Sequence, residues 1–374
     1  MPINRLYRSL RDLLVQLRPT ERQTRLRNFS WLLAGLFLSR SVHLSKIANK
    51  IPSEQATLPS VVRRLSRLVD NPSIRVREWY EPLARRLLEC QARKLGEVRL
   101  IVDGSKVGFK HRLLMVGLAY RKRAIPIAWS WVPSEKGHSS SYKQRALLGY
   151  VRRLIPDGAA RVSVVGDSEF GAVELMEQLE EWGFYYVLRQ KSSHLVCCQR
   201  CSEPHRPRRE WRALGELIER RGERVWLEGA LLSRLHAHET NLVLYWKRGQ
   251  KEPWLLATNL PECAKALSCY RRRMWIEEMF ADFKGHGFDL QSTQLRSFGR
   301  LSRLTLAVAM LYVWLVEHGA RVIKRGQRRM VDRSDRRDHS VFRLGCNMLD
   351  RCLAQVTRPS IRLLPRSLPK LSGG

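Results

Sequence analysis

The spacing of apolar residues separates a helical beginning of the chain from a mixed middle. Through residues 1 to about 95 the apolar positions recur at helical intervals, most clearly over residues 31–37. Pro52, Pro59 and Pro72 interrupt this pattern, and proline is accommodated mainly at helix starts and in turns. Residues 1–95 are therefore predicted to form an all-helical N-terminal domain made of several short elements.

Two short amphipathic segments within residues 44–71 are joined by a polar turn. This arrangement is typical of a helix-turn-helix, in which the second helix faces DNA. Arg63, Arg64 and Arg67 on the second segment are the candidate DNA contacts. A helical bundle that only supports the rest of the chain has the same pattern, so both interpretations stay open.

From Glu97 onward the pattern changes to short apolar runs that are typical of buried strands. The first run, 98–104, precedes two runs that form a hairpin around the basic turn 121–123. A helix, a strand ending at Asp167, a second helix and a fifth strand follow. Three strands, a helix, a strand, a helix and a strand is the element order of the RNase H-like fold, which predicts an α/β class with a mixed sheet.

Residues 191 to about 252 break this order. They begin polar and rich in cysteine, and then show strand-like pieces that contain Trp211, Trp226 and Trp246. We interpret them as a β-rich insertion, after which a strand at 254–260 returns to the core. The predicted organisation is an all-helical N-terminal domain (1–95) with a possible helix-turn-helix at 44–71, an RNase H-like domain with the insertion (96–320) and a basic helical tail (321–374).

Helical patterns resume after the insertion. Residues 264–284 are expected to form one helix, and the strongly apolar residues 301–319 another. No apolar run reaches the roughly 18 residues that a membrane span requires, and residues 1–17 lack the apolar stretch of a signal peptide. The chain is therefore expected in the cytoplasm, without a membrane partner.

The net charge of the chain is the strongest indication of its binding partner. Lys and Arg number 68 against 35 Asp and Glu, a formal net charge of +33. Such an excess opposes a compact state unless a polyanion neutralises it, and nucleic acid is the obvious polyanion. A solvated basic surface, or one that lies on a membrane, is the alternative.

Four residues of a tight cluster raise the question of zinc. Cys197, Cys198, Cys201 and His205 are close in sequence, but a closed zinc site usually draws two ligand pairs from separated segments. We therefore expect a solvent-exposed loop with reduced thiols here.

Asp103 and Asp167 each end a buried apolar strand, just before a Gly or Ser turn. Carboxylates at such positions project into a shared crevice at the end of a sheet. Hard divalent ions take oxygen ligands, and enzymes that transfer phosphoryl groups with two metal ions hold them with a few carboxylates. The two residues are thus candidate metal ligands.

A third acid comes from the helix predicted over 264–284. At about 100° per residue, Tyr270, Arg273, Glu277 and Lys284 fall on one narrow stripe. The neighbouring Glu278 points away from it. We therefore place Glu277 with the two aspartates.

The spacing of Tyr270, Arg273, Glu277 and Lys284 matches, at all four positions, the YREK signature of the insertion-sequence-four group of DDE transposases. The chain resembles this group over roughly 98–320. It departs from it after the second acid, where the group often has Arg and this chain has Ser168, which leaves one phosphate contact unassigned.

The resemblance implies that Asp103, Asp167 and Glu277 are catalytic and hold two Mg²⁺ or Mn²⁺ ions. It further implies that Arg273 and Lys284 contact DNA phosphates and that Tyr270 contributes its hydroxyl.

Several relatives cut the second strand through a hairpin, with one base flipped onto an aromatic residue. Stacking of this kind is worth about 1–3 kcal/mol. Trp275 on the same helix is a candidate for it, as are the tryptophans in and just after the insertion: Trp211, Trp226, Trp246 and Trp254.

The expected partner is double-stranded DNA, both transposon ends and target, bound by a homodimer in a synaptic complex. The expected reaction is strand cleavage and strand transfer. Two alternatives remain: an RNase H-like structure-specific nuclease that does not join strands, and a transposase-derived repressor that only binds DNA.

Overall fold

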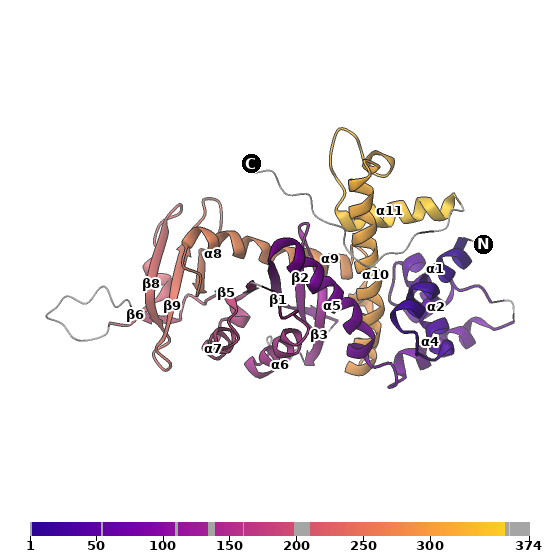
Figure 1. The fold of residues 1–374 in the computed structure, drawn as a ribbon, viewed down its shortest axis with the longest axis horizontal. Helices are drawn as coiled ribbons and strands as arrows, with labels where there is room; N and C mark the ends of the chain where they lie inside the picture. Colours follow the sequence, from indigo (N-terminus) through magenta and orange to yellow (C-terminus); the bar gives the residue numbers. More distant parts are fainter. Residues whose placement is uncertain are drawn as a thin grey trace.

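The computed structural model describes residues 2–53, 55–108, 111–133, 139–159, 161–197, 210–355 and 359. Helices gather at one end of the molecule and a long sheet extends from them (Figure 1). The long helix α10 (Phe298–Lys324) stands between these two parts and contacts both.

The N-terminal helices pack around a shared apolar core, and three of them, with 16, 17 and 20 residues, are longer than the short elements expected. Phe29, Phe37 and Trp79 are fully buried in it. The helix that was expected to begin near residue 44 is a single five-residue segment. The helices are α1 (Pro2–Leu17), α2 (Gln23–Ser39), α3 (Leu44–Ala48), α4 (Leu58–Asp70) and α5 (Val76–Leu95).

The first five strands build the part of the sheet that matches the predicted order. Strand β1 runs antiparallel to β2 and parallel to β4, and β4 runs parallel to β5. The prediction of an α/β protein with a mixed sheet is confirmed, and this order is consistent with an RNase H-like core. The strands are β1 (Glu97–Val107), β2 (His111–Tyr120), β3 (Arg123–Pro133), β4 (Arg161–Gly166) and β5 (Tyr185–Arg189).

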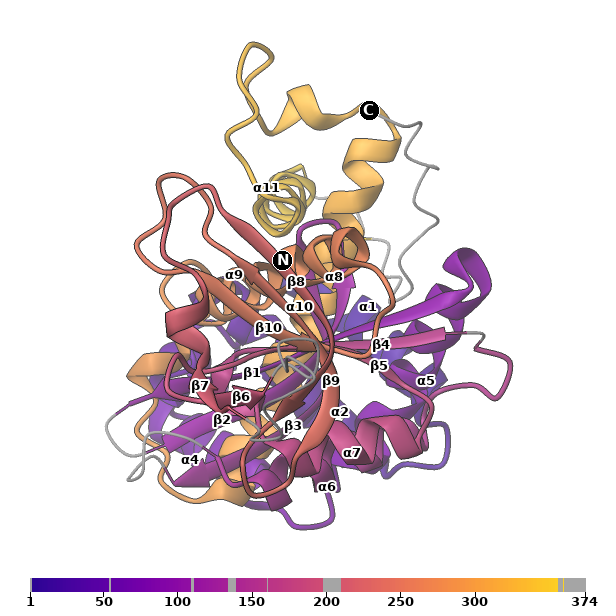
Figure 2. The ribbon, with the colours of Figure 1, turned by 90° about the vertical axis from the view of Figure 1, so that its left-hand side faces the viewer.

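The segment interpreted as an insertion continues the same sheet. Its strands β6 (Leu195–Cys197), β7 (Arg212–Ala213), β8 (Arg224–Leu232) and β9 (His238–Tyr245) join the core through β10 (Trp254–Thr258), which pairs with β9 on one side and β5 on the other. The order of the ten strands is β3-β2-β1-β4-β5-β10-β9-β8-β6-β7. Figure 2 looks along the molecule from the end formed by this segment.

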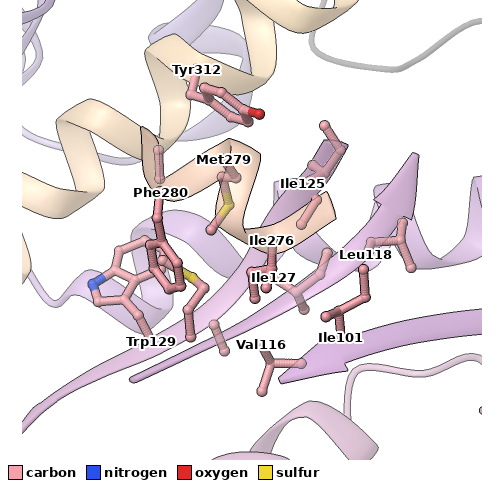
Figure 3. Close-up of a cluster of buried hydrophobic side chains, with 14 of the residues drawn as sticks. Ile101, Val116, Leu118, Ile125, Ile127, Trp129, Ile276, Met279, Phe280 and Tyr312 are labelled. Carbon is pink, nitrogen blue, oxygen red and sulfur yellow. The ribbon is translucent and has the colours of Figure 1, made fainter. Parts of the chain in front are cut away.

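Helix α9 (Met274–Phe283) packs on the sheet beside α10. Figure 3 shows Ile276, Met279 and Phe280 of α9 lying among buried side chains of β1, β2 and β3, with Tyr312 of α10 above them. This apolar contact fixes the position of α9 relative to the strands that carry the two aspartates. The remaining long helices are α6 (Ser141–Arg152), α7 (Val173–Glu181), α8 (Cys263–Tyr270) and α11 (Val341–Ala354).

The single helix predicted over 264–284 is wrong in one respect. A 3-10 turn, Arg271–Arg273, separates α8 from α9. A 3-10 turn has about 3.0 residues per turn and a longer rise than an α-helix. Residues before and after it therefore do not stay on one ideal α-helical stripe.

The expectation that no apolar run reaches membrane-spanning length is also wrong. By length and composition, α10 could cross a membrane, and it is the one helix among the described residues that could. However, 94% of its most apolar stretch is buried inside the protein. Gly319 of α10 and Gly345 of α11 let the two helices touch backbone to backbone, because a Cβ at either position would overlap a carbonyl oxygen of the other helix. Helix α10 is thus a core helix here.

Candidate active site

The two aspartates stand side by side where β1 and β4 stop pairing. The last parallel pair is Val102 with Gly166; Asp103 is the next residue of β1, and Asp167 directly follows the end of β4. Asp103 does not end its strand as expected, since β1 continues to Val107 along β2. The adjacency therefore comes from where the parallel pairing ends.

Each aspartate uses one carboxylate oxygen locally and turns the other toward the site. Asp103 Oδ1 accepts a hydrogen bond from the backbone N–H of Gly104 at 2.7 Å, and Asp167 Oδ1 accepts one from that of Ser168 at 2.5 Å. Asp167 thereby caps the 3-10 turn Ser168–Phe170. Each of these local hydrogen bonds holds its carboxylate group in one orientation, with the second oxygen directed toward the site.

All three predicted acids converge on one guanidinium group. Nη2 of Arg273 lies 3.1 Å from Asp103 Oδ2 and 2.9 Å from Asp167 Oδ2, and Nη1 lies 2.5 Å from Glu277 Oε1. Arg273 stands in the 3-10 turn and Glu277 on the first turn of α9. The turn thus places a cation among carboxylates contributed by three separate elements.

Burial makes this cluster depend on its cation. Asp103 is only 6% exposed, and burial raises its pKa to about 6 even though Arg273 acts to lower it. Burial also lowers the pKa of Arg273, but the three acids outweigh this effect and raise it overall. Without a positive charge here, three neighbouring carboxylates would repel one another in a partly desolvated site.

The donor set fits a hard divalent cation. Carboxylate oxygens are the ligands that Mg²⁺ and Mn²⁺ prefer, and two-metal sites use a few of them. As the side chains stand, no group of three or more His, Cys, Asp or Glu in the described parts of the chain is spaced to hold a metal ion. In the acid cluster the space between the carboxylates is taken by the Arg273 guanidinium, which supplies the positive charge that a metal would supply.

The four residues of the predicted stripe have different surroundings. Arg273 and Glu277 belong to the cluster, whereas Tyr270 is 3% exposed and packs edge-on against Trp254, with ring centroids 5.0 Å apart. Burial lowers the pKa of Lys284, Arg112 lowers it further and Asp103 raises it. Lys284 is therefore within electrostatic range of the acids.

Neighbouring acids on α9 face elsewhere. Glu278 lies 3.0 Å and Asp282 2.9 Å from nitrogen atoms of Arg123 on β3. These ion pairs anchor α9 to the hairpin of β2 and β3. The structure thus places Glu277, and not Glu278, beside the aspartates.

A buried polar network next to the site went unnoticed in the sequence. Glu169, two residues after Asp167, forms an ion pair with Arg112 of β2. Its other oxygen accepts hydrogen bonds from the backbone N–H and the hydroxyl of Ser139, at 2.6 and 2.7 Å. Arg112 in turn lies over Gly104, where a Cβ would sit 2.4 Å from its Nε. Only the glycine after Asp103 could have hinted at this contact.

The other candidates are scattered. Trp275 is half-buried against the core. Trp226 and Trp246 donate to Glu228 and to the carbonyl of Gln250 at 2.8 and 3.1 Å, and Trp211 is half-buried. Of the cysteine cluster, Cys197 is buried in β6, and Cys198, Cys201 and His205 lie outside the described residues. Arg63, Arg64 and Arg67 lie on α4, away from the acids, with Arg63 and Arg67 exposed and Arg64 half-buried.

Part of the chain matches a known protein family. Residues 132–314 match the transposase DDE domain. No match to a curated protein accompanies it. The matched span contains Asp167, Arg273 and Glu277, while Asp103 lies before it. The match supports a DDE transposase, a family whose members generally use divalent metal ions and act on DNA.

Proposed function

We propose that this chain is the DNA transposase of a bacterial insertion sequence, of the insertion-sequence-four group. It would bind the ends of its element and catalyse metal-dependent strand cleavage and strand transfer in the cytoplasm. The observation that carries the proposal is the convergence of Asp103, Asp167 and Glu277 on one cation, in a chain whose residues 132–314 match the transposase DDE domain.

In this proposal Asp103, Asp167 and Glu277 hold two Mg²⁺ or Mn²⁺ ions. When bound, such ions activate the attacking hydroxyl and stabilise the leaving oxygen of an in-line displacement at phosphorus. The carboxylates must be ionised to act as ligands. The local hydrogen bonds of Asp103 and Asp167 keep one oxygen of each directed into the site.

The cations of the site would hold the DNA backbone. Arg273 would leave the acids when metal ions neutralise them, and its planar fork suits a phosphate. Lys284, within electrostatic range of Asp103, would act as a point charge on a neighbouring phosphate. Tyr270 is buried against Trp254, so its proposed part is to position the turn that carries Arg273.

The rest of the chain would supply binding. The N-terminal helices would contact the element ends through Arg63, Arg64 and Arg67, and a homodimer would hold both ends in a synaptic complex. A hairpin intermediate would place a flipped base on a tryptophan, with Trp275 the candidate on α9. The high net charge of +33 supports DNA as the partner.

The test uses the purified full chain and a supercoiled plasmid that carries the DNA flanking the gene on both sides. With Mg²⁺ we expect cleavage at the element ends and joining of the released 3′-hydroxyls to a target plasmid. Chelator should abolish both products, and Asp167→Ala should do the same in the presence of Mg²⁺. Cleavage without joining would indicate the nuclease alternative, and binding without cleavage would indicate the repressor.

A further inference from the structure

A strongly basic pocket lies far along the chain from the acid cluster, between α2 and α4. Its volume is about 490 Å³. Five arginines line it, and no Asp or Glu is among the lining residues that the structure describes. The arginines are Arg22, Arg25, Arg63, Arg64 and Arg67.

Most of these arginines have no counter-ion. Arg25 is held by Glu21, whose Oε1 lies 2.6 Å from its Nη1. Among the residues that the structure describes, no carboxylate pairs with Arg22, Arg63, Arg64 or Arg67. Several guanidinium groups around one concave space repel one another, and an anion in that space would offset the repulsion.

The remaining lining groups also suit an oxyanion. Thr24, Asn28, Ser60 and Asn71 bring hydroxyl and amide donors to the wall. Helix α2 begins at this wall and has no acid in its first turn, and the side chain of its N-cap residue Arg22 makes no capping hydrogen bond. The backbone N–H of Arg22 already donates to the Glu21 carboxylate at 3.0 Å, so the start of this helix favours negative charge.

The opposite face of α4 is fixed to the catalytic part. Val61 and Leu65 are buried, and Arg300 of α10 donates to the Ser66 hydroxyl at 2.8 Å. Arg303 of α10 donates to the backbone carbonyl of Val69 at 3.1 Å. The pocket therefore has a wall that is joined directly to the long core helix.

We propose that this pocket clamps phosphodiester groups of the DNA backbone, and that Arg22 and Arg64, from its two walls, take part in the clamp. The inference rests on the proposed function, since it assumes that the chain binds DNA. A helix that reads base edges must protrude into the major groove, whereas these guanidinium groups line a recess between two helices. The pocket thus supplies sequence-independent affinity and fixes the position of the backbone relative to α10.

The experiment measures binding of the full chain to fluorescent duplexes by anisotropy, in chelator so that no cleavage occurs. One duplex carries DNA that flanks the gene and the other a scrambled sequence of equal length. Binding is titrated over a range of salt concentrations for the parent, Arg22→Gln and Arg64→Gln. Arg27→Gln is the matched control, because Arg27 is an exposed arginine of α2 outside the pocket.

We expect each pocket variant to reduce the slope of log K against log salt by about 0.9, the value for one lost phosphate contact. The weakening should be equal on both duplexes. Arg64→Lys should keep the slope, because a point charge still contacts a phosphate, and this variant also controls for folding. Arg27→Gln should leave the slope unchanged.

Three outcomes would overturn the clamp while leaving the proposed function in place. Unchanged slopes in the pocket variants would exclude a phosphate contact, and an equal loss in Arg27→Gln would mean diffuse charge. A loss confined to the flanking sequence would mean base recognition. A parent protein that binds neither duplex would overturn both proposals.

A second arm separates DNA from a free anion. Inorganic phosphate, at an ionic strength matched with chloride, should displace the duplex no better than chloride does. A saturable competition by phosphate that disappears in Arg64→Gln would assign the pocket to a free anion and overturn the clamp.

Discussion

Two regions of this molecule gather arginine in opposite ways. In the acid cluster one guanidinium, that of Arg273, meets three carboxylates. In the pocket between α2 and α4, five arginines meet, and no acid is among the described residues of its wall. The carboxylates of the first region are suited to bind cations, and the guanidinium groups of the second region are suited to bind anions.

The difference shows that arginine can have different roles according to the charged groups around it. Arg273 satisfies charges that the fold has already buried, so it stabilises the site in the absence of metal. Of the pocket arginines, only Arg25 pairs with a carboxylate of the described chain, that of Glu21, so the positions of the other four cost stability unless an anion is bound. If this difference is real, substitutions in the two regions should have different effects on activity, stability and DNA binding.

The largest effect is expected from the acids. Asp103→Ala, Asp167→Ala or Glu277→Ala removes one of the proposed metal ligands, and losing several kcal/mol of transition-state stabilisation corresponds to about a thousandfold or more in rate. Cleavage and joining are the measurements, and DNA binding in chelator should stay close to that of the parent. Glu278→Ala is the control, since Glu278 pairs with Arg123. If that control is inactive and Glu277→Ala is active, the assignment of the third acid is reversed.

Removal of Arg273 should come next, as a loss of stability. Breaking a buried ion pair costs up to about 3–5 kcal/mol, and less here because Asp167 and Glu277 are partly exposed to solvent. In chelator, Arg273→Ala should lower the free energy of unfolding, measured by denaturant titration, and Mg²⁺ should restore part of it. Arg64→Gln should not lower it. Equal losses of unfolding free energy in Arg273→Ala and Arg64→Gln would mean that the two regions do not differ in this way.

The same contrast should be visible in pH dependence. Burial raises the pKa of Asp103 to about 6, so this group holds a proton below pH 6 and must lose it to bind metal. Cleavage should therefore fall by about tenfold per pH unit below 6. DNA binding in chelator should stay flat from pH 5 to 8, because the pocket is lined by arginines and by no acid or histidine.

The free energy of unfolding of the metal-free chain should have the opposite pH dependence to cleavage and should decrease as the pH rises. Since the pKa of Asp103 is higher in the folded state than its ordinary value, protonation favours folding. The contribution is complete at low pH and is lost as the pH rises through about 6, by up to about 3 kcal/mol. Asp103→Asn should remove this dependence. A parent and an Asp103→Asn variant with identical pH profiles would show that Asp103 has an ordinary pKa.

The smallest effect is expected from the network behind the aspartates. Glu169→Gln weakens the ion pair with Arg112 and leaves the residues that hold the metal in place. Residues that orient metal ligands typically change affinity by about 10–100-fold, so the Mg²⁺ concentration for half-maximal cleavage should rise by that factor. Glu177→Gln, at an exposed position of α7, is the control. A lower melting temperature with an unchanged Mg²⁺ requirement would make Glu169 a purely structural residue.

Local patterns were sufficient to predict the strands that carry the site. The apolar runs before Asp103 and Asp167 predicted β1 and β4, and these strands are parallel neighbours. Helical periodicity separated Glu277 from Glu278, and the structure places these two side chains at different partners. Such features depend on residues close together in the sequence.

The features that sequence analysis missed depend on distant residues. The 3-10 turn at Arg271–Arg273 sets the place of Arg273 among acids that come from 170 and 106 residues away. Arg112 and Glu169 are 57 residues apart. The pocket needs α2, whose arginines look like ordinary surface residues until α4 packs beside them. The periodicity of residues within one helix or strand carries no information on contacts between residues that are far apart in the sequence.

Strand β10 has hydrogen-bonded neighbours on both sides, β5 and β9. If the chain from β6 to β9 were removed, one row of backbone N–H and C=O groups on β10 would face solvent, and such open edges recruit strands from other chains. On this side the sheet ends at β7, which has two residues and pairs with the three-residue β6. A terminal strand this short offers little for another molecule to pair with. Through β9, the segment from β6 to β9 therefore covers the edge of β10 that would otherwise be open.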